Sequence, residues 1–321
     1  MYPRRTIFGI IEFSESLYCA SDSLGKAASV ILGGVEGTLT LPSLPEWLEN
    51  EKDPLHKPLL GPPPARSWKR GETLICWGCP TSYPDGTADV ELALLEFHLE
   101  VDNAETNAQA IYTTFGTWLK LFEDYVKLQT KQRTSKNVFG GDGPGRLELL
   151  SNDATGLKHI SHTAPTSISI VMSSDDESLH FEQFTRAAQL ASNGLQPSLH
   201  YRMLLEAYIA RRNEDYRKAI IEAATALEVC LTTRIMDEFN TKGILFGEKL
   251  LQKFRMLGGR FELVRLLEID LPAKDYMTLI INPRNEVIHR ASFPDIIIAN
   301  QVIAEVEELL YMFSPQLHEN V

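Results

Sequence analysis

Long apolar runs and cysteine are scarce in this chain of 321 residues. No stretch approaches the roughly 20 consecutive apolar residues that a membrane-spanning helix needs. The first apolar run meets Glu12 too early to form the core of a signal peptide. These shortages exclude a membrane-spanning protein and argue against a secreted one. We therefore expect a soluble cytoplasmic protein that does not associate with a membrane.

Positive charge is also in short supply. The chain has 31 Lys and Arg against 43 Asp and Glu, a net charge of −12. Broad, nonspecific binding to nucleic acid needs many cations that neutralise phosphates, so this balance argues against it. The deficit is uneven, at −9 for residues 1–195 and −3 for residues 196–321. The C-terminal part is nearly balanced and can hold a local basic patch.

The four cysteines are Cys19, Cys76, Cys79 and Cys230. The spacing of Cys76 and Cys79 is that of a zinc knuckle or a redox motif, but a zinc site needs a second pair of ligands. The sequence offers His159 and His162 as that pair, about 80 residues further on. The alternative is two ordinary thiols of a strand. We assign no metal and no cofactor, and whether Cys76 and Cys79 bind metal stays open.

Residues 1–195 read as a β-rich domain with a mixed α/β sheet. Short β-branched or aromatic runs predict strands, and they lie at Ile7–Phe13, Ala27–Leu32, Gly37–Leu41, Thr73–Trp77, Asp89–Val101, Arg146–Leu150 and Thr166–Met172. The apolar phase slips at Leu94 and Leu95, which predicts a β-bulge there or a strand that changes sheets. A helix over Ala104–Leu128 carries one apolar stripe. The linker Gly194–Pro197 ends the domain.

Residues 196–321 keep a helical period throughout, so the fold class is α+β with an all-α C-terminal domain. The longest helix is predicted over Tyr216–Phe239, with the stripe Ile220, Ala223, Leu227, Cys230, Leu231 and Ile235. The segment 292–295 caps a last helix, Ile296–Phe313, that is strongly apolar. Because one face of a bundle needs fewer apolar residues, we expect a homodimer or higher oligomer through the final helices.

The segment 282–290, Asn-Pro-Arg-Asn-Glu-Val-Ile-His-Arg, carries the candidate catalytic residues Arg284, Asn285 and His289. An N-cap at Asn282 and Pro283 at the first position predict a helix that starts here. Free N–H groups at such a start favour an anion such as a phosphate. An imidazole transfers protons near neutral pH, and a guanidinium matches phosphate oxygens.

Chance accounts poorly for this spacing. From the residue counts, an Arg followed five places later by His is expected roughly 0.4 times, and roughly 0.02 times with Asn directly after the Arg. A structural explanation also exists. Arg284 can pair with a carboxylate such as Glu286 or Glu228, and His289 can bond a carbonyl near the helix end. Glu228 can instead orient Arg284 or His289.

Arg284-Asn285 with His289, late in an all-helical segment, resembles the Arg-x4-6-His signature of the HEPN family (higher eukaryotes and prokaryotes nucleotide-binding domain). The likeness covers roughly residues 197–315. A non-helical domain before the HEPN unit is similar to the ApeA-type antiphage proteins, although no N-terminal motif matches. The resemblance implies a HEPN-like helical bundle over residues 196–321, with residues 1–195 as a sensor or regulatory domain.

The resemblance implies a metal-independent endoribonuclease in antiphage defence or a toxin system. Its composite site at a dimer would use Arg284, Asn285 and His289 on an RNA substrate, and a phage-derived or toxin-system protein would trigger it. In such a site His289 is the general acid or base, Arg284 stabilises charge on the phosphate and Asn285 holds the geometry. The alternative is a non-catalytic HEPN-like module that binds RNA or a protein and is regulated by the N-terminal domain.

Overall fold

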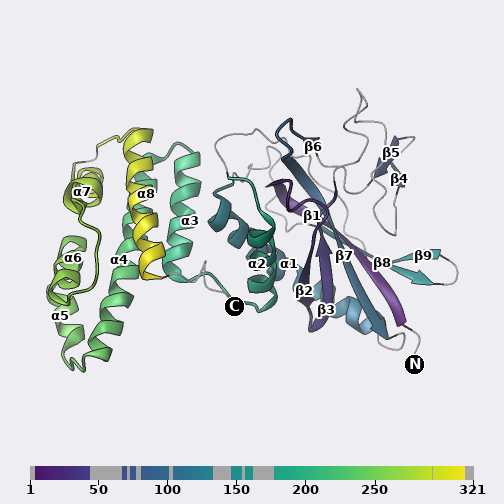
Figure 1. The fold of residues 1–321 in the computed structure, drawn as a ribbon, viewed down its shortest axis with the longest axis horizontal. Coiled ribbons are helices and arrows are strands. Elements are labelled where there is room, and N and C mark those ends of the chain that lie inside the picture. The colour runs from purple at the N-terminus through teal and green to yellow at the C-terminus, as the bar shows by residue number, and fades with distance from the viewer. Residues whose placement is uncertain are drawn as a thin grey trace. The chain divides into compact units, whose positions relative to one another are not determined.

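A computed structural model describes residues 4–43, 67–70, 73–76, 81–100, 104–132, 146–153, 156–161, 177–290 and 292–314. Contacts divide the chain into two compact units, Met1–Gln196 and Pro197–Val321. The sequence places this division one residue earlier. The first unit contains an antiparallel sheet with two helices, and the second is helical (Figure 1). The α+β class is thereby confirmed at this level.

The main sheet of the first unit has seven strands in the order β2-β3-β7-β1-β8-β9, with β6 paired to β7. They are β1 (Arg4–Cys19), β2 (Ala27–Leu32), β3 (Val35–Thr40), β6 (Thr81–Ser82), β7 (Ala88–Glu100), β8 (Arg146–Asp153) and β9 (Gly156–Ser161). Every ladder in it is antiparallel. A separate hairpin joins β4 (Ser67–Arg70) to β5 (Thr73–Cys76). The predicted strand Thr166–Met172 lies outside the described residues.

The phase slip in β7 has a different origin from the predicted bulge. The register of β7 against β1 runs unbroken from Glu100 to Leu92, and the irregularity lies in β1, between Glu12 and Leu17. Leu94 belongs to a small buried cluster with Phe8 and Ile10. Leu95 alternates to the other face of the strand and is also buried. The prediction of a bulge or of a change of sheet is wrong, because the strand runs in one continuous register through Leu94 and Leu95 and is buried on both faces there.

Two helices, α1 (Ala104–Thr130) and α2 (Phe181–Ser192), pack against each other and the sheet (Figure 1). All six residues of the predicted α1 stripe are buried: Ile111, Phe115, Trp118, Leu119, Phe122 and Val126. Phe122 is the centre of an aromatic cluster, with ring centroids 5.8 Å from Phe13, 5.3 Å from Trp118 and 6.1 Å from Phe184. The core of the first unit therefore lies between α1, α2 and the sheet.

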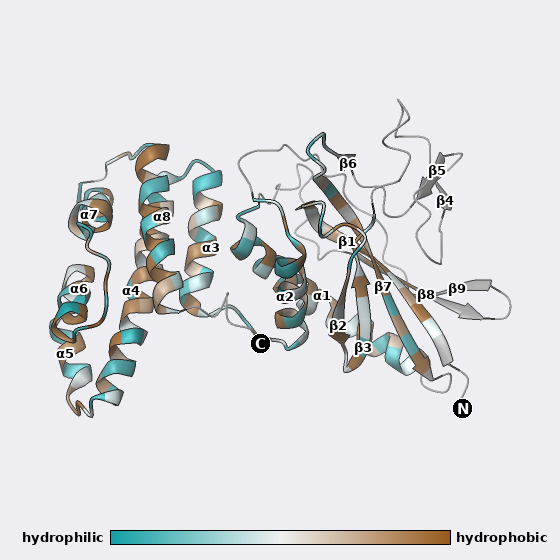
Figure 2. Cartoon of the chain, viewed as in Figure 1, coloured by the Kyte–Doolittle hydropathy of each residue, from teal (hydrophilic) through white to brown (hydrophobic). Residues whose placement is uncertain are grey.

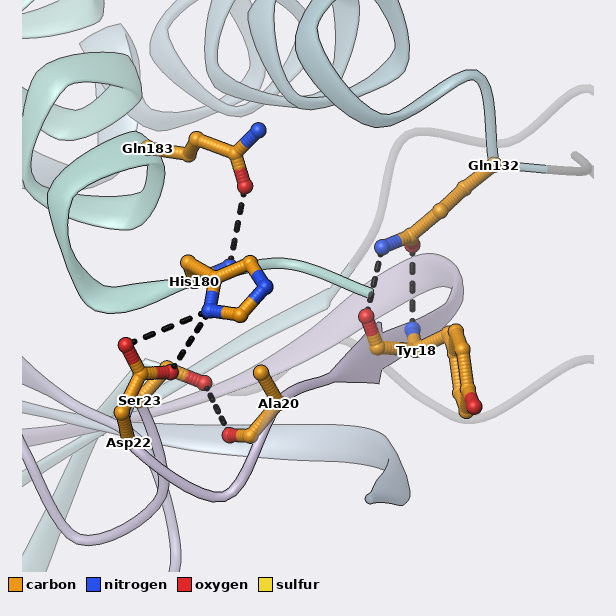
Figure 3. A network of polar contacts seen from close by, with 7 residues as sticks. All are labelled: Tyr18, Ala20, Asp22, Ser23, Gln132, His180 and Gln183. Carbon is orange, nitrogen blue, oxygen red and sulfur yellow. Dashed lines mark hydrogen bonds and ion pairs between the residues drawn. The ribbon is translucent and has the colours of Figure 1, made fainter. Parts of the chain in front are cut away.

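The end of β1 is held to both helices by polar contacts (Figure 3). The Gln132 side chain accepts the Tyr18 N–H at 3.0 Å and donates to the Tyr18 carbonyl at 2.5 Å, as a neighbouring strand would. Next to it, His180 Nδ1 lies 3.2 Å from an Asp22 carboxylate oxygen, directly before α2. The exit of α1 and the entry of α2 are thereby fixed beside the same strand.

The second unit contains α3 (Leu199–Arg212), α4 (Tyr216–Thr241), α5 (Gly247–Lys253), α6 (Leu257–Leu266), the π-helical turn η4 (Met277–Ile281), α7 (Asn282–His289) and α8 (Ile296–Phe313). The helices α3, α4 and α8 pack side by side, and α6 and α7 lie on α4 (Figure 1). The turn η4 packs against α8 and α6. All six residues of the predicted stripe on α4 are buried. This stripe confirms the helical period of the sequence, while likeness to a HEPN bundle stays a prediction.

Candidate functional site

The helix that carries Arg284, Asn285 and His289 begins earlier than the sequence indicates. Asp275 caps it, because its carboxylate accepts the Thr278 N–H at 3.2 Å and the Thr278 hydroxyl at 2.7 Å. Asn282, the predicted N-cap, has helical backbone angles (φ −63°, ψ −49°) and lies inside the helix. The predicted start at Pro283, and with it the anion site at free N–H groups, is therefore wrong.

A widened turn explains how proline lies inside this helix. Pro283 has no N–H, and its ring would meet the carbonyl four residues earlier in a regular α-helix. In η4 the Asn282 N–H instead bonds the Met277 carbonyl, five residues back. This π-type spacing makes room for the ring. The chain therefore continues through Pro283 into α7.

The structure brings two of the three predicted residues together. Arg284 Nη1 donates to Asn285 Oδ1 at 3.1 Å, and both side chains are half-buried. His289 lies exposed in the last turn of α7. Within the described part of the chain its side chain forms no hydrogen bond or ion pair. The imidazole is therefore accessible, and it is not joined to Arg284 or Asn285 within one chain.

The carboxylates expected beside the motif are engaged elsewhere. Glu286 accepts from Arg290 at 2.7 Å. Glu228 acts on Arg260, whose pKa burial lowers and the Glu228 carboxylate raises. Arg284 forms no ion pair with a carboxylate among the residues that the structure describes. Neither the structural explanation for Arg284 nor the orienting role predicted for Glu228 is supported by these contacts.

Two residues that the sequence does not point to lie against the same helix. Arg217, in the first turn of α4, donates from Nη2 to the Val287 carbonyl at 3.4 Å. Its guanidinium carbon lies 5.4 Å from the centre of the Phe293 ring, a cation–π distance. Phe293 is 86% exposed. No sequence signal links these residues, because they lie far apart in the chain and only the packing of α7 on α4 brings them together.

Hydrogen bonds define the turn between α7 and α8. The N–H groups of Arg290 and Ser292 both donate to the Glu286 carbonyl, at 3.0 and 3.3 Å. Such paired bonds close the C-terminus of a helix. Asp295 then accepts the Ile298 N–H at 2.9 Å and caps α8, which confirms the predicted cap. Phe293 therefore lies between two fixed helix ends.

The first unit has a histidine–carboxylate pair of its own. His180 and Asp22 are both largely exposed, and an aspartate can orient an imidazole for proton transfer (Figure 3). Ser23, which follows Asp22, is fully buried and its hydroxyl donates to the Ala20 carbonyl at 2.8 Å. Ser23 is therefore not available as a nucleophile for His180.

A buried carboxyl lies in the same unit. Asp89 is 6% exposed and accepts a hydrogen bond from the Tyr83 hydroxyl. Burial raises the pKa of Asp89, and the bond to Asp89 raises the pKa of Tyr83 to about 12. Burial likewise raises the pKa of the Cys19 thiol, which keeps it protonated and unreactive. These groups act as structural elements of the core.

An open depression of about 630 Å³ lies in the second unit, lined by Arg265 and residues 268–275. Lys274 in its wall is paired with Glu305 at 2.9 Å and Glu308 at 2.6 Å. Arg284 and His289 do not line it. The depression ends at Asp275, the cap of the motif helix.

The described residues hold no cluster of three or more His, Cys, Asp or Glu that would suit a metal ion. Cys79 and His162 of the possible zinc site lie outside these residues, as do the side chains of Cys76 and His159. No described helix is long and apolar enough to cross a bilayer.

No protein family, curated protein or solved structure matches the chain. The class that fold and site define is an α+β chain of two units. Its helical unit carries an exposed His289 on the same helix as Arg284, which has no carboxylate partner among the described residues.

Proposed function

We propose that the chain is a metal-independent endoribonuclease of the HEPN type, acting in antiphage defence or a toxin system. The supporting observation is the state of the three motif residues. Arg284 is held by Asn285 and is not neutralised by any described carboxylate, and His289 is exposed and unengaged one helical turn further on. A guanidinium and an imidazole available together are suited to a phosphodiester.

In this proposal the RNA supplies its own nucleophile. The 2′-oxygen attacks the phosphorus, the bond to the 5′-oxygen breaks, and a 2′,3′-cyclic phosphate and a 5′-hydroxyl form. His289 takes the proton from the 2′-OH or gives one to the leaving 5′-oxygen. Arg284 stabilises charge on the phosphate oxygens, and Asn285 holds its guanidinium. Because the 2′-OH is the nucleophile, RNA is the substrate and DNA is not.

A second copy of the chain completes the proposed site. Arg284 and His289 are not joined by a contact within one chain. In a dimer, the His289 side chains of two protomers would act on one phosphate, one as the acid and the other as the base. Exposed apolar residues at the start of α8 favour such pairing: Ile296, Ile297 and Ile298 are 50%, 71% and 39% exposed (Figure 2). The proposed assembly is a homodimer or higher oligomer. A phage-derived or toxin-system protein would act on the first unit as trigger.

The same apolar surface favours a second candidate function. In this alternative the helical unit is a non-catalytic HEPN-like module that binds RNA or a protein, and the first unit regulates it. The exposed helix start would then be a binding surface, with no need for two His289 side chains to face one cleft.

Cleavage of total cellular RNA, with a chelator present, distinguishes the two. We expect His289→Ala to lower cleavage by about 10²–10⁴-fold, the usual contribution of a general acid or base. His98→Ala is the matched control, because His98 is an exposed histidine of β7 outside the motif. Wild-type products should end in 2′,3′-cyclic phosphate. Equal activity of wild type and His289→Ala would remove His289 from the reaction, and no cleavage by either protein would favour the binding module.

A further inference from the structure

The Phe293 ring is the most exposed aromatic side chain beside the motif helix. It is 86% exposed, and the Arg217 guanidinium lies over it at 5.4 Å. Burial of an aromatic ring normally stabilises a fold, so a ring left in solvent and paired with a cation suggests a ligand with a flat face. The remainder of the ring surface is open to such a ligand.

Phe293 is held close to His289. Phe293 follows His289 by four positions, so their Cα atoms lie within about 14 Å even at full extension. The bonds of Arg290 and Ser292 to the Glu286 carbonyl, and the Asp295 cap of α8, fix the backbone on both sides of the ring. The ring is thus placed by the same short segment that ends the motif helix.

The charge around the ring suits a polyanion. Neither Arg217 nor Arg284 forms an ion pair with a carboxylate in the part of the chain that the structure describes. A base stacked on an aromatic ring, with arginine on the backbone, is a common way to hold single-stranded nucleic acid.

We propose that Phe293 and Arg217 form a nucleotide subsite, in which the ring stacks an unpaired RNA base and the guanidinium contacts the adjoining backbone. The subsite rests on the proposed ribonuclease function and narrows its substrate to single-stranded RNA. Bases of an A-form duplex are already stacked and cannot reach a side chain without being splayed out. The subsite therefore selects unpaired nucleotides next to the bond that is cut.

Binding of a 2′-O-methyl RNA tests this subsite, because that RNA cannot be cleaved through its 2′-oxygen. The affinity of the full-length protein is measured by fluorescence anisotropy for one strand and for its duplex. We expect Phe293→Ala to weaken single-strand binding by about 5- to 150-fold and duplex binding less than about two-fold. Phe293→Trp, which keeps an aromatic ring, should retain the single-strand affinity of the wild type. Phe246→Ala, which removes another exposed aromatic side chain of the second unit, should leave both affinities unchanged.

Sedimentation of each variant separates RNA binding from protein pairing. A lower molar mass for Phe293→Ala would make the ring a contact between copies and overturn the subsite. Unchanged single-strand affinity, or an equal loss for the duplex, would overturn it as well. If His289→Ala abolishes cleavage while Phe293→Ala leaves affinity intact, the ribonuclease proposal stands without the subsite. If the wild-type protein cuts no RNA but Phe293→Ala weakens single-strand binding, the ribonuclease proposal fails and the subsite stands as an RNA-binding site.

Discussion

Substitution of Tyr276 tests how the motif helix is held in place. Tyr276 is the first residue of that helix and is 2% exposed. Its ring is stacked on Phe261, with centroids 4.9 Å apart and planes 11° from parallel. Its hydroxyl donates to the Pro272 carbonyl at 3.2 Å. The ring and the hydroxyl therefore make separable contributions to the free energy of unfolding.

Tyr276→Phe removes only the hydroxyl, so we expect a loss of about 0.5–1.5 kcal/mol, the net contribution of one hydrogen bond. Tyr276→Ala also removes the ring from the core and should cost about 3–5 kcal/mol, as for other buried aromatic residues. Tyr216→Phe is the control, because its half-buried side chain makes no hydrogen bond within the described residues. It should change stability by less than about 0.5 kcal/mol.

The two units can be followed separately in one urea titration. All four tryptophans lie in residues 1–196, so tryptophan fluorescence reports the first unit, while far-UV circular dichroism also reports the helices of the second. The Tyr276 variants should move the dichroism transition and leave the fluorescence transition in place. Equal costs for Phe and Ala, or a fluorescence midpoint that moves in step, would refute the reasoning.

Two predictions concern the first unit. Gly37→Ala should destabilise it by about 1–3 kcal/mol, because a Cβ there would lie 2.6 Å from Cε1 of Phe97; an unchanged fluorescence midpoint would contradict this. Folding raises the pKa of Asp89, so this group favours folding below its ordinary pKa of 3.8 and loses that contribution as pH rises through the folded value. The urea midpoint of the first unit should therefore fall as pH rises through this range. Asp89→Asn, which can still accept from Tyr83, should make the midpoint less dependent on pH, and an unaltered pH profile would contradict this.

Local periodicity was enough to predict the long helices. The stripes of α1 and α4 are buried as expected, and Asp295 caps α8, because each pattern lies within one element. Features that depend on packing between elements could not be predicted from the sequence. In the sequence, burial of Leu94 and Leu95 on opposite faces of β7 resembles a bulge, and Asn282-Pro283 resembles a helix start.

The candidate site shows the same limit. The residue types Arg284, Asn285 and His289 could be selected from spacing, but the partner of each could not. The Arg284–Asn285 bond and the Glu286–Arg290 pair are local to α7, whereas the position of Arg217 over Phe293 follows from how α7 lies on α4. A contact of that last kind joins residues far apart in the chain and leaves no periodic trace in it.

The widened turn η4 amounts to one extra residue within a helix. Each residue of an α-helix turns the chain by about 100°, so everything after the turn is rotated by that amount relative to a straight helix. Deletion of a single residue from Met277–Ile281 would keep the sequence 282–290 intact and point Arg284 and His289 in another direction. The orientation of the motif is therefore encoded in the residues before it, and a relative could retain every motif residue while presenting a different surface.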